Sequence, residues 1–268
     1  MARALRWILV VAGALVMVFP FAWAVVTSLT PEGALFGTPP DLTPDDADLG
    51  AYARLLEALP FWRILLNSAW IGLVSTLLQL VTSAMAAYAF ARLPFPGRGA
   101  VFAVYLATLM VPMQVLVVPL FIEMRAVDLV DTYFAVLAPG IASAFGVFLL
   151  RQAVAQVPRE LDEAAVLDGA GHVRVFVSIV LPLIRPALAT FAIFGFMASW
   201  NAYLWPLVII RSPEFMTLPL GLASLHGQFT TEWNVVMAGS VISVVPILVL
   251  YVLAQKHVIA SVAQSGLK

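Results

Sequence analysis

The sequence predicts an all-α protein that crosses a membrane six times, and three observations predict it. The 268 residues are 62% hydrophobic and only 11% charged, with a mean hydropathy of +1.00, whereas soluble domains carry roughly 25% charged residues. Six charge-free runs each approach or exceed the roughly 20 residues that span a bilayer core as a helix. Basic residues also gather in alternate loops. Because lipid offers the backbone no hydrogen-bond partners, helices are the expected form of each span.

The predicted spans cover residues 7–29, 64–91, 99–122, 132–150, 186–210 and 233–255. The first run also has features of a cleavable signal, namely Arg3 and Arg6 at its start and the triplet Ala22 to Ala24. Its apolar stretch continues to Leu29, which is longer than a typical signal core, so we favour a retained span.

Prolines recur inside the spans, and each either kinks a helix for packing or marks a hinge between two states; they are Pro20, Pro112, Pro119, Pro139, Pro206 and Pro246.

The distribution of charge predicts that both termini are cytoplasmic. With the N-terminus inside, the inside segments hold ten of the 14 basic residues and only four of the 15 acidic ones, as the positive-inside rule requires.

The longest outside loop, residues 31–63, is acidic and rich in proline, and we expect a short surface helix over residues 52–59. The inside turn 92–98 contains Pro94, Pro96 and Gly97, which permit a tight reversal. Without a repeat or a linker, one membrane domain over residues 1–268 is the expectation.

The largest inside segment, residues 156–182, has the pattern of a short helix and a turn. Pro158 suits the first turn of a helix, where a missing N–H costs nothing, and three acidic residues follow near the positive end of that helix. Gly169 tolerates the left-handed conformation that ends a helix. A second amphipathic piece, residues 172–181, leads to Pro182 and the next span. Taken alone, this pattern indicates an ordinary solvated connector.

The spacing of residues in that segment resembles the EAA loop of bacterial ABC-importer permeases. Glu163, Ala164, Ala165 and Gly169 fill the fixed positions of its first part, and after nine further residues Ile179, Leu181 and Pro182 fill the second. Segments 199–206 (SWNAYLWP) and 217–222 (TLPLGL) are similar to the carbohydrate branch of that family, in the shorter subunit of the maltose and glycerol-3-phosphate systems. The similarity covers nearly the whole chain and implies the type I ABC-importer permease fold, with a cytoplasmic coupling loop at about 156–182.

The resemblance also implies residue roles and partners. In the family, the first helix of this loop docks into a cleft of a cytoplasmic ATPase. By position, Glu163 is the charged contact, Ala164 and Ala165 form the small surface that lets the helix seat, Gly169 is the bend and Asp168 is a second polar contact. The expected partners are a second homologous permease, a dimer of the ATPase that binds ATP and Mg²⁺, and an extracytoplasmic solute-binding protein, all at the bacterial inner membrane. The chain itself is expected to bind no cofactor.

A few polar residues inside the spans are candidates for a solute path. Trp200 and Asn201 lie just outward of the middle of the fifth span, where an indole can stack on a sugar and an amide can bind its hydroxyls. Asn67 and Gln114 are further candidates. The ordinary role of such groups is hydrogen bonding between helices. The resemblance suggests a sugar, a polyol or a glycerol-phosphate-type solute.

The sequence also excludes several classes of function. The six runs contain no ionisable residue, so a proton relay through this chain is not expected. There is no phosphate-binding G-x-x-x-x-G-K-[ST] loop, the three histidines lack metal-ligand spacing, cysteine is absent, and neither a catalytic set nor a nucleic-acid-binding basic patch is visible. The alternatives that remain are a gradient-driven carrier or channel without an ATPase and, with little support, a membrane-embedded enzyme or sensor.

Overall fold

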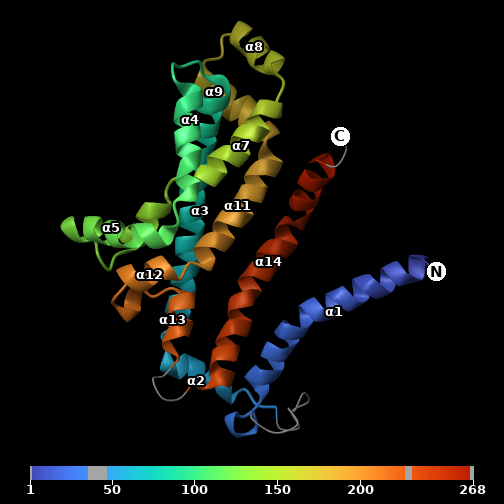
Figure 1. Cartoon of the computed structure of the whole chain (residues 1–268), viewed down its shortest axis with the longest axis vertical. Coiled ribbons are helices and arrows are strands. Elements are labelled where there is room, and N and C mark those ends of the chain that lie inside the picture. Colours follow the sequence, from blue (N-terminus) through green and yellow to red (C-terminus); the bar gives the residue numbers. More distant parts are fainter. Residues whose placement is uncertain (1, 36–46, 227–230, 266–268) are drawn as a thin grey trace. The chain divides into compact units, whose positions relative to one another are not determined.

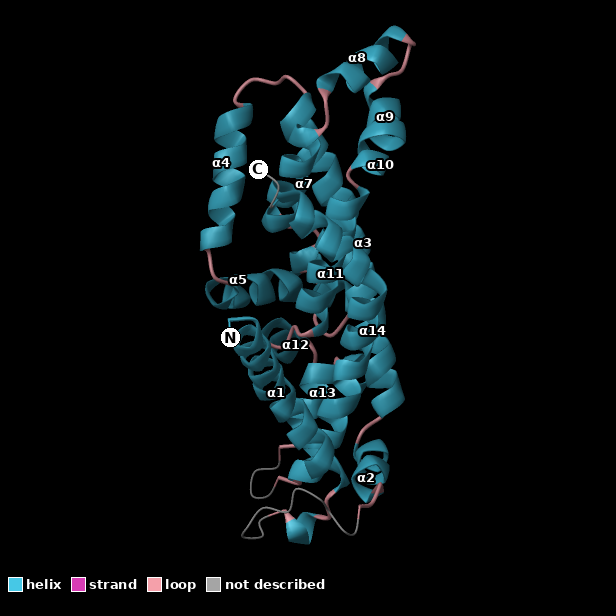
Figure 2. Cartoon of the chain, turned by 90° about the vertical axis from the view of Figure 1, so that its right-hand side faces the viewer, coloured by secondary structure: helices cyan, strands magenta, loops and turns pink. Residues whose placement is uncertain are grey.

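The chain is described here from a computed structural model, which covers residues 2–35, 47–226 and 231–265. Every regular element in these ranges is a helix (Figure 2). The chain divides into two compact units, one of residues 1–65 and 217–248 and the other of residues 66–216 and 249–268. The most acidic part of the first predicted loop, around Asp45, lies outside the described residues. The prediction of one membrane domain over residues 1–268 stays a prediction.

The first unit contains the first predicted span and the predicted outside loops around it. Its elements are α1 (Ala2–Leu29), the 3₁₀ turn η1 (Glu32–Ala34), α2 (Gly50–Ala58), α13 (Leu218–Ser224) and the first part of α14 (Trp233–Ser265). Helix α2 confirms the predicted surface helix. Tyr52 on α2 shares a hydrogen bond of 2.9 Å with Ser28 of α1, and Asn234 donates to the Thr30 carbonyl at 3.2 Å. These polar contacts hold α2 and α14 against the C-terminal end of α1.

The second unit is built around α3 (Phe61–Arg92), most of which belongs to it. Helices α7 and α11 run alongside α3 (Figures 1 and 2), and α4 contacts the end of α3 where the rings of Phe90 and Phe102 lie 5.3 Å apart. The fully buried Leu150 and Phe191 pack with Ala84 and Ala87 of α3 to form its core. The other α-helices are α4 (Arg98–Ala107), α5 (Met113–Ala126), α6 (Tyr133–Leu137), α7 (Ala144–Gln156), α8 (Arg159–Leu167), α9 (His172–Val175), α10 (Leu181–Leu183), α11 (Arg185–Trp200) and α12 (Leu204–Ile209).

Three of the predicted spans are broken rather than continuous. Residues 98–110 and 113–126 meet at 99° beside Pro112, because the residue before a proline is driven out of the helical region. Residues 133–140 and 144–156 meet at 47°, next to Pro139 and Gly140. The predicted span 186–210 breaks at Asn201, where α11 ends and α12 begins three residues later. Pro20, Pro119 and Pro246, in contrast, lie inside unbroken helices.

By length and composition, α1, α3 and α14 are each able to cross a membrane alone. Three bent helix pairs could each form one further span, which raises the count to six. Two of these pairs are the broken spans at 98–126 and 133–156, and the third joins residues 172–183 to α11 at 78°. The chain is therefore an all-helical polytopic membrane protein of up to six spans.

Hydroxyl groups on α3 satisfy backbone groups that the break before α7 releases. Thr82 Oγ1 donates to the Ile141 carbonyl at 2.8 Å, and Ser83 Oγ donates to the Ser143 carbonyl at 3.4 Å. Ser143 in turn caps α7, accepting a hydrogen bond from the Gly146 amide at 3.1 Å. These contacts confirm that polar residues of the second span bind between helices, as such groups commonly do.

Candidate functional site

The predicted inside segment folds as the sequence indicates. Pro158 precedes α8, and Glu160 and Asp162 lie in its first turn, where the helix dipole favours negative charge. Gly169 ends the helix with φ of +83°. The Gly169 amide donates to the Val166 carbonyl at 3.0 Å and the Ala170 amide to that of Ala165 at 2.9 Å, which is the Schellman arrangement. The predicted bend at Gly169 is confirmed, and α8 lies at one end of the second unit (Figures 1 and 2).

Helix α8 has an inner and an outer face. Ala165 is partly buried and packs on a cluster that includes Tyr88 of α3 and Val175 of α9. Four of the five residues predicted to contact an ATPase, namely Glu163, Ala164, Asp168 and Gly169, are exposed, and so is Leu167 at 88%. The exposed part of α8 and its C-terminal end therefore offers acidic groups, the small Ala164 and the large apolar side chains of Leu161, Val166 and Leu167 to a partner, while Ala165 seats the helix on its own bundle.

An ion pair that the sequence did not predict ties the inner face of α8 to α3. The Nε atom of Arg92 lies 2.7 Å from Oδ2 of Asp162, and Nη2 of Arg92 donates to the Val157 carbonyl at 2.6 Å. The side chains of Arg92 and Asp162 are 7% and 17% exposed. Each residue was visible in the sequence as a charge at a helix end, but nothing in the sequence relates two charges seventy positions apart.

A groove of about 470 Å³ opens beside this ion pair. It lies between α8, α9 and the end of α3, and its walls include Tyr88, Arg159, Glu163 and His172. The groove means that α8 does not lie flush on the bundle along its whole length. The contacts of α8 with the bundle include the ion pair and the partly buried Ala165, and Ala170, just after the helix, packs on the same cluster.

The four predicted solute-path residues differ in exposure: Asn67 and Trp200 are buried, whereas Asn201 and Gln114 are exposed. Asn67 is buried, and its amide is engaged: it donates to the Glu214 and Met216 carbonyls at 2.8 and 3.0 Å and accepts from Tyr133 at 2.7 Å. Trp200 is 2% exposed and stacks on Phe196, with ring centres 5.6 Å apart.

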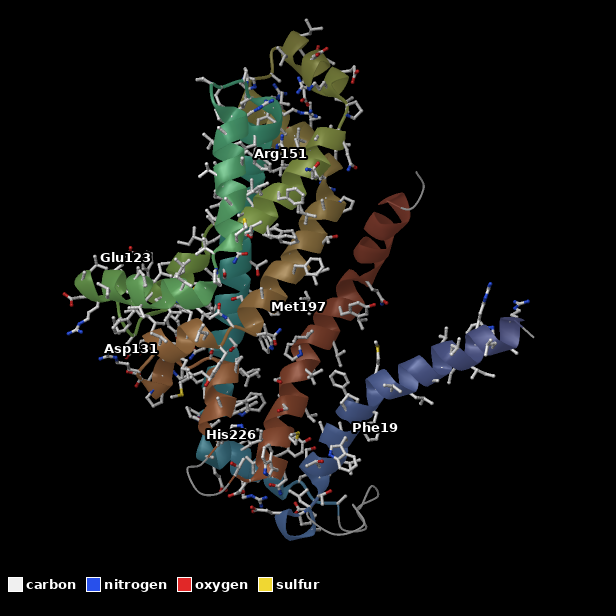
Figure 3. The ribbon with its side chains drawn as sticks, in the orientation of Figure 1. Phe19, Glu123, Asp131, Arg151, Met197 and His226 are labelled. Carbon is white, nitrogen blue, oxygen red and sulfur yellow. The ribbon has the colours of Figure 1, made fainter. Side chains whose placement is uncertain are left out.

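Asn201 and Gln114, in contrast, are exposed. Asn201 ends α11 and donates to the carbonyl of Met197, which is labelled in Figure 3. Trp205 on α12 is buried and donates to the Ala135 carbonyl at 2.9 Å, so it fixes α12 against α6.

A carboxylate that the sequence analysis did not single out organises the predicted outer end of the second unit. Asp131 (Figure 3) accepts hydrogen bonds from the amides of Arg211 and Ser212 at 2.8 and 3.0 Å, and also from the Ser212 hydroxyl. Burial raises the pKa of the Asp131 carboxyl, but these hydrogen bonds and the Arg211 charge outweigh it and place the pKa below its ordinary value. The described residues contain no group of three or more side chains suited to a metal ion.

Comparison with known proteins places these features in a family. Residues 79–264 match the family described as the binding-protein-dependent transport system inner membrane component. The chain is 37% identical to the arabinooligosaccharides transport system permease protein AraQ of Halalkalibacterium halodurans, over 98% of this chain and 97% of that protein. It is 36% identical to the lactose transport system permease protein LacG of Rhizobium radiobacter, over 91% and 89%. It is 32% identical to the sn-glycerol-3-phosphate transport system permease protein UgpE of Escherichia coli K12, over 96% and 94%.

A solved structure agrees with these relatives. The chain superposes with a TM-score of 0.81 on a chain of a bacterial ABC transporter involved in the import of the acidic polysaccharide alginate. The two are 26% identical, and the match covers 94% of this chain and 95% of the other. The broken spans and the protruding α8 therefore belong to a fold already seen in an importer.

Proposed function

We infer the function of this chain from its family, since it belongs to the binding-protein-dependent transport system inner membrane components. It is a non-catalytic, multi-pass permease subunit of an ABC importer in the inner membrane. ATP is bound by the partner ATPase, and a periplasmic binding protein belongs to the transporter. The solute is of the sugar type. A carrier that acts without an ATPase is not supported.

The outer face of α8 is proposed as the ATPase-docking surface. What supports this is the exposure of Glu163, Ala164, Asp168 and Leu167 on one short helix that protrudes from the bundle. A protruding helix with one charge and a small, partly apolar surface fits the helix-in-groove mode of recognition. Ala165 is assigned to the seat of this helix and Gly169 to its terminal bend. A second homologous permease and two copies of the ATPase complete the proposed assembly.

Charge reversal at Glu163 tests the docking. The transporter is expressed with its partners, and both solute uptake and the amount of ATPase that co-purifies are measured for Glu163→Lys. Both are expected to fall well below wild type. The matched control is Glu123→Lys, an equally exposed charge on α5 (Figure 3), which is expected to leave the ATPase bound. Unchanged uptake and co-purification in Glu163→Lys would refute the docking role.

The proposed solute is a neutral oligosaccharide. The six charge-free runs contain no basic residue to pair with an anion, and AraQ and LacG are named for an arabinooligosaccharide system and a lactose system. Glycerol-3-phosphate is the second candidate, from the resemblance to UgpE. Calorimetry of the cognate binding protein with arabinooligosaccharides, lactose and glycerol-3-phosphate distinguishes the two classes. Binding of glycerol-3-phosphate alone would reject the oligosaccharide.

Asn201 is the proposed solute contact among the four candidates. It lies where α11 stops and the backbone leaves the helix, and irregular backbone at membrane depth is tolerated where it is buried in protein or lines a water-filled cavity. Exposed Gln114 is assigned to the same path. Asn201→Ala is expected to raise the KM for uptake while the ATPase stays bound. An unchanged KM would remove Asn201 from the path.

A further inference from the structure

The contact between Arg92 and α8 joins the proposed docking helix to the longest helix of the second unit. Arg92 is the last residue of α3. Its guanidinium group reaches Asp162 within α8 and the Val157 carbonyl just before α8 begins. Two points of attachment on one planar group restrain the direction of the helix as well as its position, since a guanidinium presents its donors in a rigid fork. The angle between α8 and α3 is therefore restrained by this one side chain.

The surroundings suit a contact that transmits force rather than one that only fills space. The contact between Nε and Oδ2 is an ion pair by distance without the alignment of a hydrogen bond, and among the described residues Oδ1 of Asp162 is buried without a hydrogen-bond partner. Burying an ion pair costs desolvation free energy that an apolar pair of equal volume does not cost, so a buried ion pair contributes little to stability. Beside it, the 470 Å³ groove leaves α8 room to tilt.

Helix α3 is suited to carry such a displacement onward. It runs unbroken from Phe61 to Arg92. Along its length, Thr82 binds the break before α7, and Asn67 binds the carbonyls of Glu214 and Met216. A rigid helix with fixed contacts at both ends and in the middle moves as one body. A tilt imposed on α8 by a partner would thus reach the 214–216 segment without a further moving part.

We propose that Arg92 and Asp162 are positioning residues that lock α8 to α3, so that a movement of the docked helix becomes a movement of α3. The inference rests on the proposed docking of α8, but it concerns Asp162, which contacts α3 and is not among the proposed docking residues. Loss of the ion pair therefore leaves the ATPase bound and uncouples it. Loss of the docking face detaches the ATPase.

The first experiment uses the whole transporter in liposomes with its ATPase and binding protein. For Arg92→Gln and Asp162→Asn, we expect wild-type co-purification of the ATPase and at least about a fivefold fall in solute imported per ATP hydrolysed, the lower end of usual coupling strengths. The charge-swapped double variant Arg92→Asp with Asp162→Arg is expected to recover most of that ratio. Arg151→Gln is the matched control, because Arg151 also lies near the end of α3, packs over Phe102 and does not contact α8 in the described ion pairs and hydrogen bonds.

A wild-type transport ratio in both single variants would overturn the proposal. So would loss of the ATPase in the single variants without recovery in the swap, because the pair would then only hold the loop in its fold. The docking proposal fails by a different result, namely retention of the ATPase in Glu163→Lys.

A second measurement needs no loss of function. The chain contains no cysteine, so the pair Met85→Cys on α3 and Glu160→Cys on α8 accepts two spin labels; both positions are exposed, and neither belongs to the proposed docking surface. We expect one narrow distance distribution that is the same without nucleotide and with ATP trapped. In Arg92→Gln the distribution is expected to broaden. A distance that changes between the two states of the wild type would show that α8 moves independently of α3, and the proposal would be wrong.

Discussion

Gly146 on α7 tests the packing of the second unit, because a methyl group there has no space. A Cβ atom at this position would lie 2.3 Å from Cζ of Phe191 and 2.6 Å from Oγ of Ser83. Real Cβ contacts do not approach 3.0 Å, so the ring or the helix must shift. Phe191 is 1% exposed and belongs to the core, which leaves its ring little room to yield.

The expected cost of Gly146→Ala follows from two opposing effects. Overpacking a well-filled core typically costs about 1–3 kcal/mol, and a clash with a buried ring belongs at the upper end. Replacing a helical glycine by alanine returns roughly 0.5–1 kcal/mol through the lower entropy of the unfolded chain. The net destabilisation is therefore about 2 kcal/mol. At roughly 2–4 °C per kcal/mol, the value for soluble domains of 150–250 residues, the melting temperature should fall by several degrees.

Gly195 on α11 provides a control of opposite sign. A Cβ atom there would meet Gln79 Oε1 at 3.5 Å and Thr76 Cγ2 at 3.6 Å, which are ordinary contacts. Gly195→Ala should therefore leave stability unchanged or raise it by up to about 1 kcal/mol. Thermal unfolding of the purified protein in detergent measures both variants. Adding Phe191→Leu to Gly146→Ala removes the outer ring atoms and should recover part of the loss. If Gly146→Ala melts at or above wild type, α7 does not pack on α11 as described.

Three further outcomes are expected. Asn67→Ala removes the amide that donates to the Met216 carbonyl and should lower the free energy of unfolding by about 1–3 kcal/mol, as measured by thermal unfolding. An effect confined to the KM of uptake would instead return Asn67 to the solute path. In the folded protein the pKa of the Asp131 carboxyl lies below the ordinary value of 3.8, so the stability that its negative charge contributes is present above pH 3.8 and is lost as pH falls through the folded pKa. The difference in melting temperature between wild type and Asp131→Asn should therefore be full at pH 7 and vanish below the folded pKa. Thr82→Val removes the donor to the Ile141 carbonyl and should cost roughly 1 kcal/mol, and equal melting of the two proteins would contradict the contact.

The sequence predicted the features that depend on local chemistry. Long charge-free runs predict segments buried in lipid, and a glycine after a short acidic helix predicts a left-handed residue that ends the helix. Both the spans and the turn at Gly169 could therefore be predicted from the sequence. Span continuity was harder to predict. Six prolines lie in the predicted spans, but the helix breaks beside Pro112 and Pro139 and continues through Pro20, Pro119 and Pro246. At the break before α7, Thr82 of α3 supplies a donor to the Ile141 carbonyl, and a single sequence does not show which neighbour will supply such a donor.

Three of the contacts that the sequence could not predict share one element, α3. Arg92 with Asp162, Thr82 with Ile141 and Asn67 with Met216 each join α3 to a segment at least fifty residues away. Each partner is an ordinary residue at a helix end or a loop, so composition gives no sign of the pairing. Polar groups inside a bilayer are costly unless they are paired, which means that the few polar residues of α3 are where its neighbours must attach. Since α3 joins the proposed docking helix at one end and the 214–216 segment at the other, a substitution at Asn67 should alter the coupling of the importer even though it lies far from any proposed ATPase contact.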